Sequence, residues 1–392
     1  MPSTRLTRLK QRKKNSRMVV GLAAGVLLLL LIVFIARIWG FYSKIHTVAK
    51  TPGKLAQQKE KNEYTVLLLG YGGGKHEGTY LTDTIMAAHV NLKKKEVMLI
   101  SIPRDIWVKV PTKVNSDTFH AKINSVYQMG LFPENYPDIN TKYITEDNPS
   151  GLIKQVVKDI TGLEVDYFVA VDFEGFTRVI DILNGIDLIV ERSFTDYEYP
   201  IEGKEDDPCD KKDQELEDAV KQATQEPVLA FPCRYETLQF TKGETHMDGA
   251  TALKYARSRH ALEDGGDFNR AKRQQNVIEA VKEKVLTIGF IPKIIPLIDE
   301  LEEHIKMDLE LSIINKFLLE ARNSEQYKRK SFVIEGEFLT DGYSDYGQYI
   351  IIPRKGIDRW DEIKTEINNI LLNITPTPSI KPTKKVTPTK NL

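Results

Sequence analysis

Hydrophobic positions in the first half of the chain form short runs that predict alternating strands and helices. Tyr64–Gly70 is an apolar run that ends in glycines, which is typical of a buried strand. Asp83–Asn91 and Glu96–Ile102 flank a Leu-Lys-Lys-Lys turn, an arrangement that predicts a hairpin. Further elements are expected as helices over Ser150–Ile160 and Phe173–Leu183, and as strands over Asp166–Val171 and Ile186–Val190.

The pattern is interrupted once and then resumes. Residues 198–235 are rich in Asp and Glu and have little apolar periodicity, so we interpret them as an acidic surface insertion. Later elements are expected as helices over Thr245–Ala256, Asp267–Lys284, Ile291–Arg322 and Arg359–Leu372, and as strands near Ser331–Glu335 and Tyr349–Pro353. Strands alternating with helices predict an α/β fold, in which helices cover a sheet.

The N-terminus has a different pattern. Met18–Ala36 contains no charged residue, and as a helix it would cover roughly 28 Å, about the thickness of a membrane's hydrocarbon core. Basic residues without acids precede it, and Trp39, Phe41 and Tyr42 follow it like an interfacial belt. We therefore predict one N-terminal transmembrane helix over 18–38, a cytoplasmic N-terminus and a folded domain outside the cell membrane. A cleaved signal peptide is the alternative, although no small-residue cleavage site follows the run.

These patterns divide the chain into segments. We predict a basic cytoplasmic tail (1–17), the transmembrane helix (18–38), a juxtamembrane linker (39–62), a main α/β domain (63–286), a C-terminal part of the fold or small accessory domain (287–373), and a disordered Thr/Pro/Lys tail (374–392). Cys209 and Cys233 lie in the segment placed outside, where a disulfide is permitted and could add about 3 kcal/mol; two free cysteines remain the alternative.

The densest candidate chemistry is a cluster of arginines. Arg257 and Arg259 are two residues apart, so in extended chain they project to one side. Two glycines then lead to Asp267 at an expected helix N-cap, with Arg270 and Gln274 on the same helix face. Guanidinium groups beside a helix N-terminus match phosphate oxygens, so we predict an oxyanion site. The alternative is that the arginines only pair with Glu263, Asp264 and Asp267 on a solvated face.

A second set of residues follows the expected hairpin. Pro103 would stop the strand, so that Arg104 emerges at the end of the sheet, where ligand sites of α/β proteins usually lie. Lys122 offers a further cation, and Asp83 could hold Mg²⁺ against phosphate oxygens. Taken alone, Asp83 could equally be a turn or capping residue.

Several common activities are excluded. Lys+Arg and Asp+Glu both number 55, so no overall field draws the chain to nucleic acid. The glycine-rich segment from Gly70 to His76 lacks the glycine spacing and the Ser/Thr of a phosphate-binding P-loop. The chain also lacks the G-x-S-x-G motif of serine hydrolases and the H-E-x-x-H motif of zinc proteases.

Taken together and in order, these motifs resemble the LytR-CpsA-Psr (LCP) family of bacterial cell-envelope proteins. The resemblance covers about Tyr64 to Leu286 and rests on LTDTIMAAHV, VMLISIPRD, AKINSVY, DYFVAVDFEGFTRVIDILNGIDLIV, MDGATALKYARSRH and DFNRAKRQQ. It implies a central mixed sheet flanked by helices. It also implies a phosphotransferase that moves a glycopolymer from an undecaprenyl-pyrophosphate carrier onto peptidoglycan, forming a phosphodiester link.

The resemblance also implies roles for individual residues. Carried over by motif, the pyrophosphate would be bound by Arg104, Lys122, Arg257, Arg259, Arg270 and Gln274, with Asp83 holding Mg²⁺ and Asp267 orienting the arginines. Asp83, Arg104, Arg257, Arg259 and Asp267 would be the catalytic set.

The chain departs from the family pattern at two positions. Gly72 stands where the family commonly has Asp, which bears on the metal site; His76 or Glu77 could replace that ligand. Leu81 stands where the family commonly has Arg, which removes one phosphate contact. Two other functions therefore stay open: hydrolysis of polyprenyl-pyrophosphate lipids by water, and non-catalytic binding of such lipids in regulation.

Overall fold

The computed structural model describes residues 36–37, 39–40, 42–44, 61–74, 78–114, 119–144, 149–285, 301–321 and 323–374. The predicted transmembrane helix over 18–38, the tail over 374–392 and residues His76 and Glu77 therefore lie almost wholly outside the described residues. Within the described ranges, no helix is long and apolar enough to cross a membrane.

A mixed sheet of six strands forms the centre of the fold, as predicted. Its order is β11-β6-β1-β2-β3-β12, with β1 parallel to β6 and antiparallel to β2, and β3 parallel to β12. The strands are β1 (Glu63–Tyr71), β2 (Thr82–Asn91), β3 (Glu96–Ser101), β6 (Tyr167–Asp172), β11 (Ile305–Met307) and β12 (Lys328–Val333). Because β11 and β12 belong to this sheet, the C-terminal residues build the same sheet as the residues before 286.

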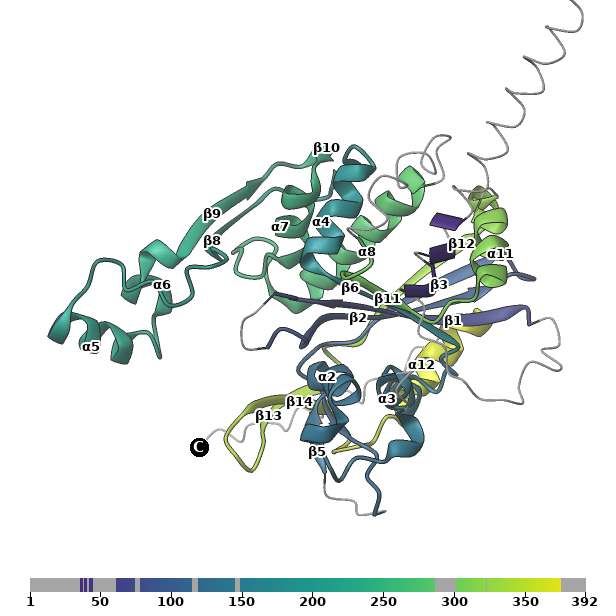
Figure 1. Cartoon of the computed structure of the whole chain (residues 1–392), viewed down its shortest axis with the longest axis horizontal. Helices are drawn as coiled ribbons and strands as arrows, with labels where there is room; N and C mark the ends of the chain where they lie inside the picture. The colour runs from purple at the N-terminus through teal and green to yellow at the C-terminus, as the bar shows by residue number, and fades with distance from the viewer. Residues whose placement is uncertain are drawn as a thin grey trace, which may run out of the picture.

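Helices cover both faces of the sheet (Figure 1). On one face lie α2 (Val126–Leu131), α3 (Gly151–Thr161) and α12 (Asp361–Leu372); on the other lie α4 (Phe173–Ile182), α7 (Gly249–Arg257), α8 (Gly266–Val285) and α11 (Leu311–Ala321). Shorter ladders join β4 (Trp107–Lys109) to β5 (His120–Lys122), β7 (Ile186–Val190) to β10 (Gly243–Met247), β8 (Phe194–Pro200) to β9 (Tyr235–Phe240), and β13 (Leu339–Tyr343) to β14 (Tyr349–Pro353).

The two faces of β1 have different surroundings, because successive side chains of a strand point to opposite faces. Leu67 and Leu69 belong to the main hydrophobic core under α3 and α12 and are almost fully buried. On the other face, Val66 packs with residues of α11 in a separate cluster, whereas Leu68 and Gly70 line a cavity. One face of the sheet is thus solidly packed and the other is left partly open.

Two expected helices were wrong in part. Within the expected helix Thr245–Ala256, the first residues form β10, which pairs with β7, and α7 begins only at Gly249. Within the expected helix Ile291–Arg322, residues Ile305–Met307 form β11 and pair with β6. In both places the residues form a strand that pairs with β7 or β6. Such pairing depends on the tertiary structure, so the spacing of hydrophobic residues along the chain does not predict it.

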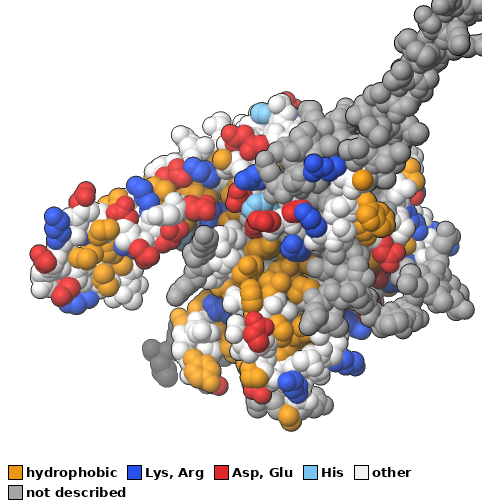
Figure 2. Space-filling view, in the orientation of Figure 1, with side chains coloured by type: hydrophobic (Ala, Val, Ile, Leu, Met, Phe, Trp, Pro, Cys, Tyr) orange, Lys and Arg blue, Asp and Glu red, His pale blue; other side chains and the backbone are white. Residues whose placement is uncertain are grey.

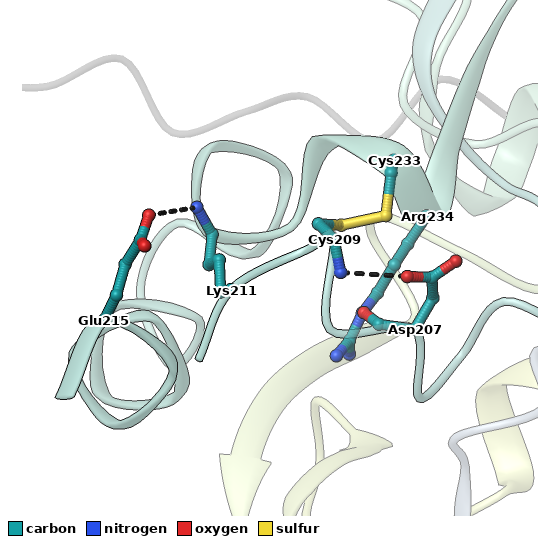
Figure 3. The surroundings of a disulfide bond; sticks show 6 residues. All are labelled: Asp207, Cys209, Lys211, Glu215, Cys233 and Arg234. Carbon is teal, nitrogen blue, oxygen red and sulfur yellow. Dashed lines mark hydrogen bonds and ion pairs between the residues drawn. A yellow bond between two sulfur atoms is a disulfide. The ribbon is translucent and has the colours of Figure 1, made fainter. Parts of the chain in front are cut away.

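The acidic insertion forms an arm that projects from the body of the molecule (Figure 1). The antiparallel strands β8 and β9 are its stalk, and α5 (Asp213–Gln222) and α6 (Pro227–Ala230) lie at its end. Acidic and basic side chains are interspersed along it (Figure 2). Of the two alternatives that the sequence left open for the cysteines, the structure has the disulfide: Cys209 and Cys233 are bonded with 5.6 Å between their Cα atoms, and their surroundings are drawn in Figure 3.

Candidate active site

A cavity of about 500 Å³ lies between the open face of the sheet and the helices α4, α7 and α8. Its inner walls are apolar, with side chains from β1, β6 and all three helices: Leu68, Val169, Val171, Phe176, Val179, Leu253, Val277, Ile278 and Val281. From the sequence pattern, Val277 and Ile278 were expected to pack α8 against the rest of the domain. In the structure they also line this cavity, so part of the apolar face of α8 remains available to a ligand.

The predicted cations gather around the same cavity. Its lining includes, from four different segments of the chain, Asp83, Arg104, Arg257, Arg259, Arg270 and Gln274. Strand ends and helix ends that are far apart in sequence therefore bring four guanidinium groups to one place. The cavity combines an apolar interior with a side rich in arginines, and Asp83, Asp172 and Asp196 in the same lining offset part of their charge.

Asp267 lies among these arginines. Its Oδ1 atom is 2.9 Å from Nε of Arg259 and 3.4 Å from Nη1 of Arg270. It was expected at the N-cap of α8, but the helix begins at Gly266, so Asp267 lies in the first turn. From there its carboxylate lies between two arginines instead of capping the helix.

Arg270 is the most buried member of the cluster, with only 6% of its surface exposed. Burial lowers its pKa to about 10; Asp267 opposes this effect, while the like charges of Arg259 and Arg104 add to it. Among the described residues, its buried Nε atom has no hydrogen-bond partner, and the same holds for Nε of Arg104. Buried N–H groups without acceptors are rare and costly, so an acceptor from a ligand or from water would stabilise both.

Arg104 is held by carboxylates on both sides. Its Nη1 atom contacts Asp83 and its Nε atom lies 3.5 Å from Asp105. Burial alone would lower the pKa of Arg104, but Asp83 and Asp105 outweigh it, so that the pKa is raised. Lys122 donates to Asp105 at 2.8 Å and does not line the cavity. Lys122 is therefore linked to Arg104 through Asp105, which both side chains contact, and it does not face the cavity itself.

Arg257 is positioned by aromatic rings. Its guanidinium carbon lies 4.3 Å from the centroid of Phe173 and 5.8 Å from that of Tyr199. These rings hold the guanidinium group through its face, and its side chain also hydrogen-bonds that of Tyr199. Gln274 donates to the backbone carbonyl of Ala256 at 3.4 Å, which ties α8 to the end of α7.

Two residues that position the arginines were missed in the sequence. Asp196 is 1% exposed and accepts hydrogen bonds from the Ser258 hydroxyl and from the backbone N–H groups of Arg259 and His260. Arg273 is 2% exposed and donates to the carbonyls of Tyr255 and Ser258 and to Asp264. No local pattern marks Asp196, because its partners lie more than 60 residues away.

The alternative, in which the arginines pair with Glu263, Asp264 and Asp267, holds in the structure for Asp267 alone. Asp264 pairs with the structural Arg273 at 2.7 Å, and Glu263 accepts from the backbone of Thr195. Of the three acidic residues considered for that alternative, only Asp267 contacts arginines that line the cavity. Asp267 therefore offsets part of the charge of Arg259 and Arg270, whereas Glu263 and Asp264 have other partners.

The fit to a metal ion rests on Asp83. In the described part of the chain, the one close group of three potential ligands is Asp207, Cys209 and Cys233, whose sulfurs are joined in the disulfide. Asp172, beneath the glycine turn, accepts from Gly175 N and pairs with His304, so both of its oxygens are engaged. One carboxylate suits Mg²⁺, which takes few protein ligands and binds mainly substrate phosphates and water.

Comparisons with known proteins agree with this geometry. The chain matches the LytR_cpsA_psr family over residues 39–366. A protein of Enterococcus faecalis named polyisoprenyl-teichoic acid–peptidoglycan teichoic acid transferase TagU is 22% identical over 327 residues, covering 82% of this chain and 86% of the relative. Biofilm regulatory protein A of Streptococcus mutans is 23% identical over 302 residues, covering 76% of this chain and 61% of the relative.

A solved structure has the same fold. The crystal structure of B. subtilis TagV superposes with a TM-score of 0.51 at 22% identity, covering 81% of this chain and 100% of the other. The family match spans most of the chain and includes every residue of the arginine cluster. The protein therefore belongs to the LytR-CpsA-Psr family.

Proposed function

We propose that this protein is a phosphotransferase that moves a glycopolymer from an undecaprenyl-pyrophosphate carrier onto peptidoglycan. The product would be a phosphodiester link between the two polymers, and the carrier would leave as undecaprenyl phosphate. Relatives named as teichoic acid transferases support transfer to peptidoglycan as the activity.

The observation that carries this proposal is the cavity's division into an apolar interior and an arginine cluster. A ligand that fills both must have a long hydrocarbon chain and a compact, highly charged head. A polyprenyl pyrophosphate has these two parts in this order. Hydrocarbon would cover the walls from α4 and α8, and the pyrophosphate would meet the guanidinium groups and the unmatched Nε atoms of Arg104 and Arg270.

The chemistry needs little beyond positioning and charge neutralisation. Phosphoryl transfer spreads negative charge over the oxygens of the transferred group, and fixed cations stabilise that charge. Arg257 and Arg259 would bind one side of the pyrophosphate and Arg104 and Arg270 the other, with Gln274 as an uncharged donor. Asp267 would hold Arg259 and Arg270 in place, because it already contacts both.

Asp83 would hold Mg²⁺ together with phosphate oxygens. The ion would add positive charge at the pyrophosphate, a role to which a single carboxylate beside the cluster is suited. Asp83 contacts Arg104 in the structure, so metal binding would require this ion pair to open or to be shared. Gly72 and Leu81 supply neither the carboxylate nor the cation that the family commonly has at these positions. Asp83 and the arginine cluster alone would therefore bind the metal ion and the pyrophosphate.

We further propose that the protein is anchored in the cell membrane by one N-terminal helix, with its N-terminus cytoplasmic. A site outside the membrane has no supply of nucleotide, so the donor's own pyrophosphate would drive the transfer. An anchor would also keep the cavity close to the lipid headgroups from which the donor comes.

The test uses the purified full chain in detergent with a polyprenyl-pyrophosphate glycan, a peptidoglycan oligomer and Mg²⁺, followed by mass spectrometry. We expect a phosphodiester-linked conjugate that is lost in Arg257→Ala and Asp83→Ala. Free glycan phosphate without conjugate would indicate a hydrolase instead. Binding of the lipid with neither product would indicate a regulatory binding protein.

A further inference from the structure

A second cavity, of about 530 Å³, adjoins the first. The two share Asp83, Arg270 and Gln274 in their linings, so the arginine cluster separates them. The walls of the second cavity come from the ends of β3 and β12, the first turn of α8 and the β13–β14 hairpin. It is the more polar of the two.

The hairpin is tied to the segment that carries Arg104. The N–H of Ile351 in β14 donates to the carbonyl of Asp105 at 3.0 Å, and Ile351 also forms a parallel bridge with Ile106. The wall of the second cavity is therefore fixed relative to Arg104 by backbone bonds. A ligand bound there would be held in register with the arginine cluster.

Four carboxylates line this cavity, and only one of them is unpaired. Asp83 contacts Arg104, Asp267 contacts Arg259 and Arg270, and Asp341 accepts from the Tyr349 hydroxyl at 2.7 Å. Glu335 follows β12, is half-buried, and has no side-chain partner among the described residues. Burial raises its pKa, and no neighbouring charge contributes to that shift.

We infer that the second cavity binds the acceptor saccharide and that Glu335 takes the proton of its attacking hydroxyl. The inference rests on the proposed transferase function and names where its acceptor sits. The ring of Tyr349 offers an apolar face to a sugar ring, while Glu335 and Asp341 offer oxygens that accept from sugar hydroxyls. Arg270 and Gln274, on the shared wall, would bring the donor phosphate to that hydroxyl.

The step balances without any further reactant. The acceptor hydroxyl oxygen forms a bond to the glycan-bearing phosphorus, and the bond from that phosphorus to the bridging oxygen breaks. The electron pair of the broken bond leaves with the polyprenyl phosphate, whose charge the arginines stabilise. The hydroxyl proton passes to Glu335. A carboxylate with a raised pKa is a better base than an ordinary glutamate at neutral pH.

The protonation of Glu335 depends on the other charged and titratable groups that line the cavity. They are Asp83, Asp267, Arg270, Asp341, Tyr349 and Arg354. Arg354 is engaged with the carbonyls of Gly336 and Leu339, and Asp83 and Asp267 are engaged with arginines. Glu335 is thus the carboxylate of this lining that has no side-chain partner among the described residues, and burial raises its pKa above the usual range.

The experiment compares two pairs of variants in the full-length protein. Tyr349→Ala is matched by Tyr346→Ala, which alters a tyrosine of the same hairpin that is 90% exposed and lies outside the cavity. Glu335→Gln is matched by Glu337→Gln, an exposed neighbour. Rates of transfer are measured against peptidoglycan-oligomer concentration and pH, and binding of polyprenyl-pyrophosphate disaccharide is measured separately.

We expect Tyr349→Ala to raise KM for the oligomer about tenfold, the loss that one ring contact of about 1.4 kcal/mol predicts, with donor binding unchanged. Glu335→Gln should lower kcat by about 10²-fold or more and remove the acidic limb of the pH profile. Both matched controls should behave as wild type.

Transfer by Tyr349→Ala and Glu335→Gln at wild-type rates would overturn the acceptor site and leave the transferase function standing. A wild-type protein that binds the donor yet transfers nothing would instead overturn the proposed function, and the acceptor site with it. Equal losses in a variant and its matched control would also overturn the inference, because the effect would then belong to the surrounding segment and not to the residue in the cavity.

Discussion

Arg270 and Arg273 lie one turn apart on α8, are almost equally buried, and should respond in opposite ways to replacement by methionine. Arg273 has hydrogen-bond acceptors for all three nitrogens, whereas Arg270 has Asp267 at 3.4 Å and an Nε without a partner. If Arg270 serves to bind an anionic ligand, its buried positive charge lowers the free energy of unfolding of the protein without that ligand. Removing that charge should then relieve the cost.

The magnitude follows from the pKa of Arg270. Burial first of all, and then the like charges nearby, lower it to about 10 despite Asp267. At about 1.36 kcal/mol for each pKa unit below an ordinary arginine, folding loses about 3 kcal/mol to this group at neutral pH. The unfolded chain holds the proton more tightly, so the cost is fully present below pH 10 and is relieved only above it. Arg270→Met should be as stable as wild type or up to about 3 kcal/mol more stable.

Arg273→Met should instead lose about 3–5 kcal/mol, because Asp264 and two backbone carbonyls would remain buried without their donor. Stability is measured by denaturant unfolding with and without a polyprenyl pyrophosphate. At a ligand concentration of about 100 times Kd the wild type should gain about 2.7 kcal/mol. Arg270→Met should gain little.

An Arg270→Met protein that is destabilised as much as Arg273→Met, yet gains the full stabilisation from the lipid, would refute this reasoning. It would mean that Arg270 is a structural residue satisfied within the fold. The cationic side of the cavity would then need another explanation.

Three other features give independent predictions. Leu253→Trp fills the apolar cavity, so affinity for a long polyprenyl pyrophosphate should fall at least tenfold while affinity for a short-chain analogue stays unchanged; equal losses for both would contradict the cavity's assignment to the chain. Removal of divalent cations by EDTA should abolish transfer reversibly, and Asp83→Asn should raise the Mg²⁺ concentration required; full activity in EDTA would exclude the metal. Joint replacement of Cys209 and Cys233 by serine should destabilise the end of the arm by about 3 kcal/mol and speed proteolysis between 198 and 235, with unchanged global unfolding; protection equal to wild type would contradict this.

Much of the fold could be predicted from local pattern. The hairpin of β2 and β3, the strand β6 and the helix α8 lie close to where apolar spacing placed them. The exceptions, β10 and β11, are short strands whose formation depends on pairing with β7 and β6. Such pairing is a property of the assembled sheet, and no spacing within Thr245–Met247 or Ile305–Met307 reports it.

The candidate site was predictable in its charges but not in its shape. Arginine density around Arg257 and Arg270 indicated an anion site, and the structure brings these residues together. The cavity itself could not be predicted, because an apolar residue that lines a cavity, such as Val277, has the same spacing as one in a packed core. The support from Asp196 was equally hidden, since it depends on a contact across 62 residues to Ser258.

The central claim is that a polyprenyl chain occupies the cavity beneath α4, α7 and α8 while its pyrophosphate lies on the arginines. The most direct measurement is photo-crosslinking with a polyprenyl pyrophosphate that carries a diazirine midway along its chain, followed by mapping of the labelled peptides. The account predicts labels on α4 and on the Val277–Val281 segment of α8, suppressed by Leu253→Trp and by excess unlabelled lipid. Labels confined to the arm or to the α3–α12 face would contradict it.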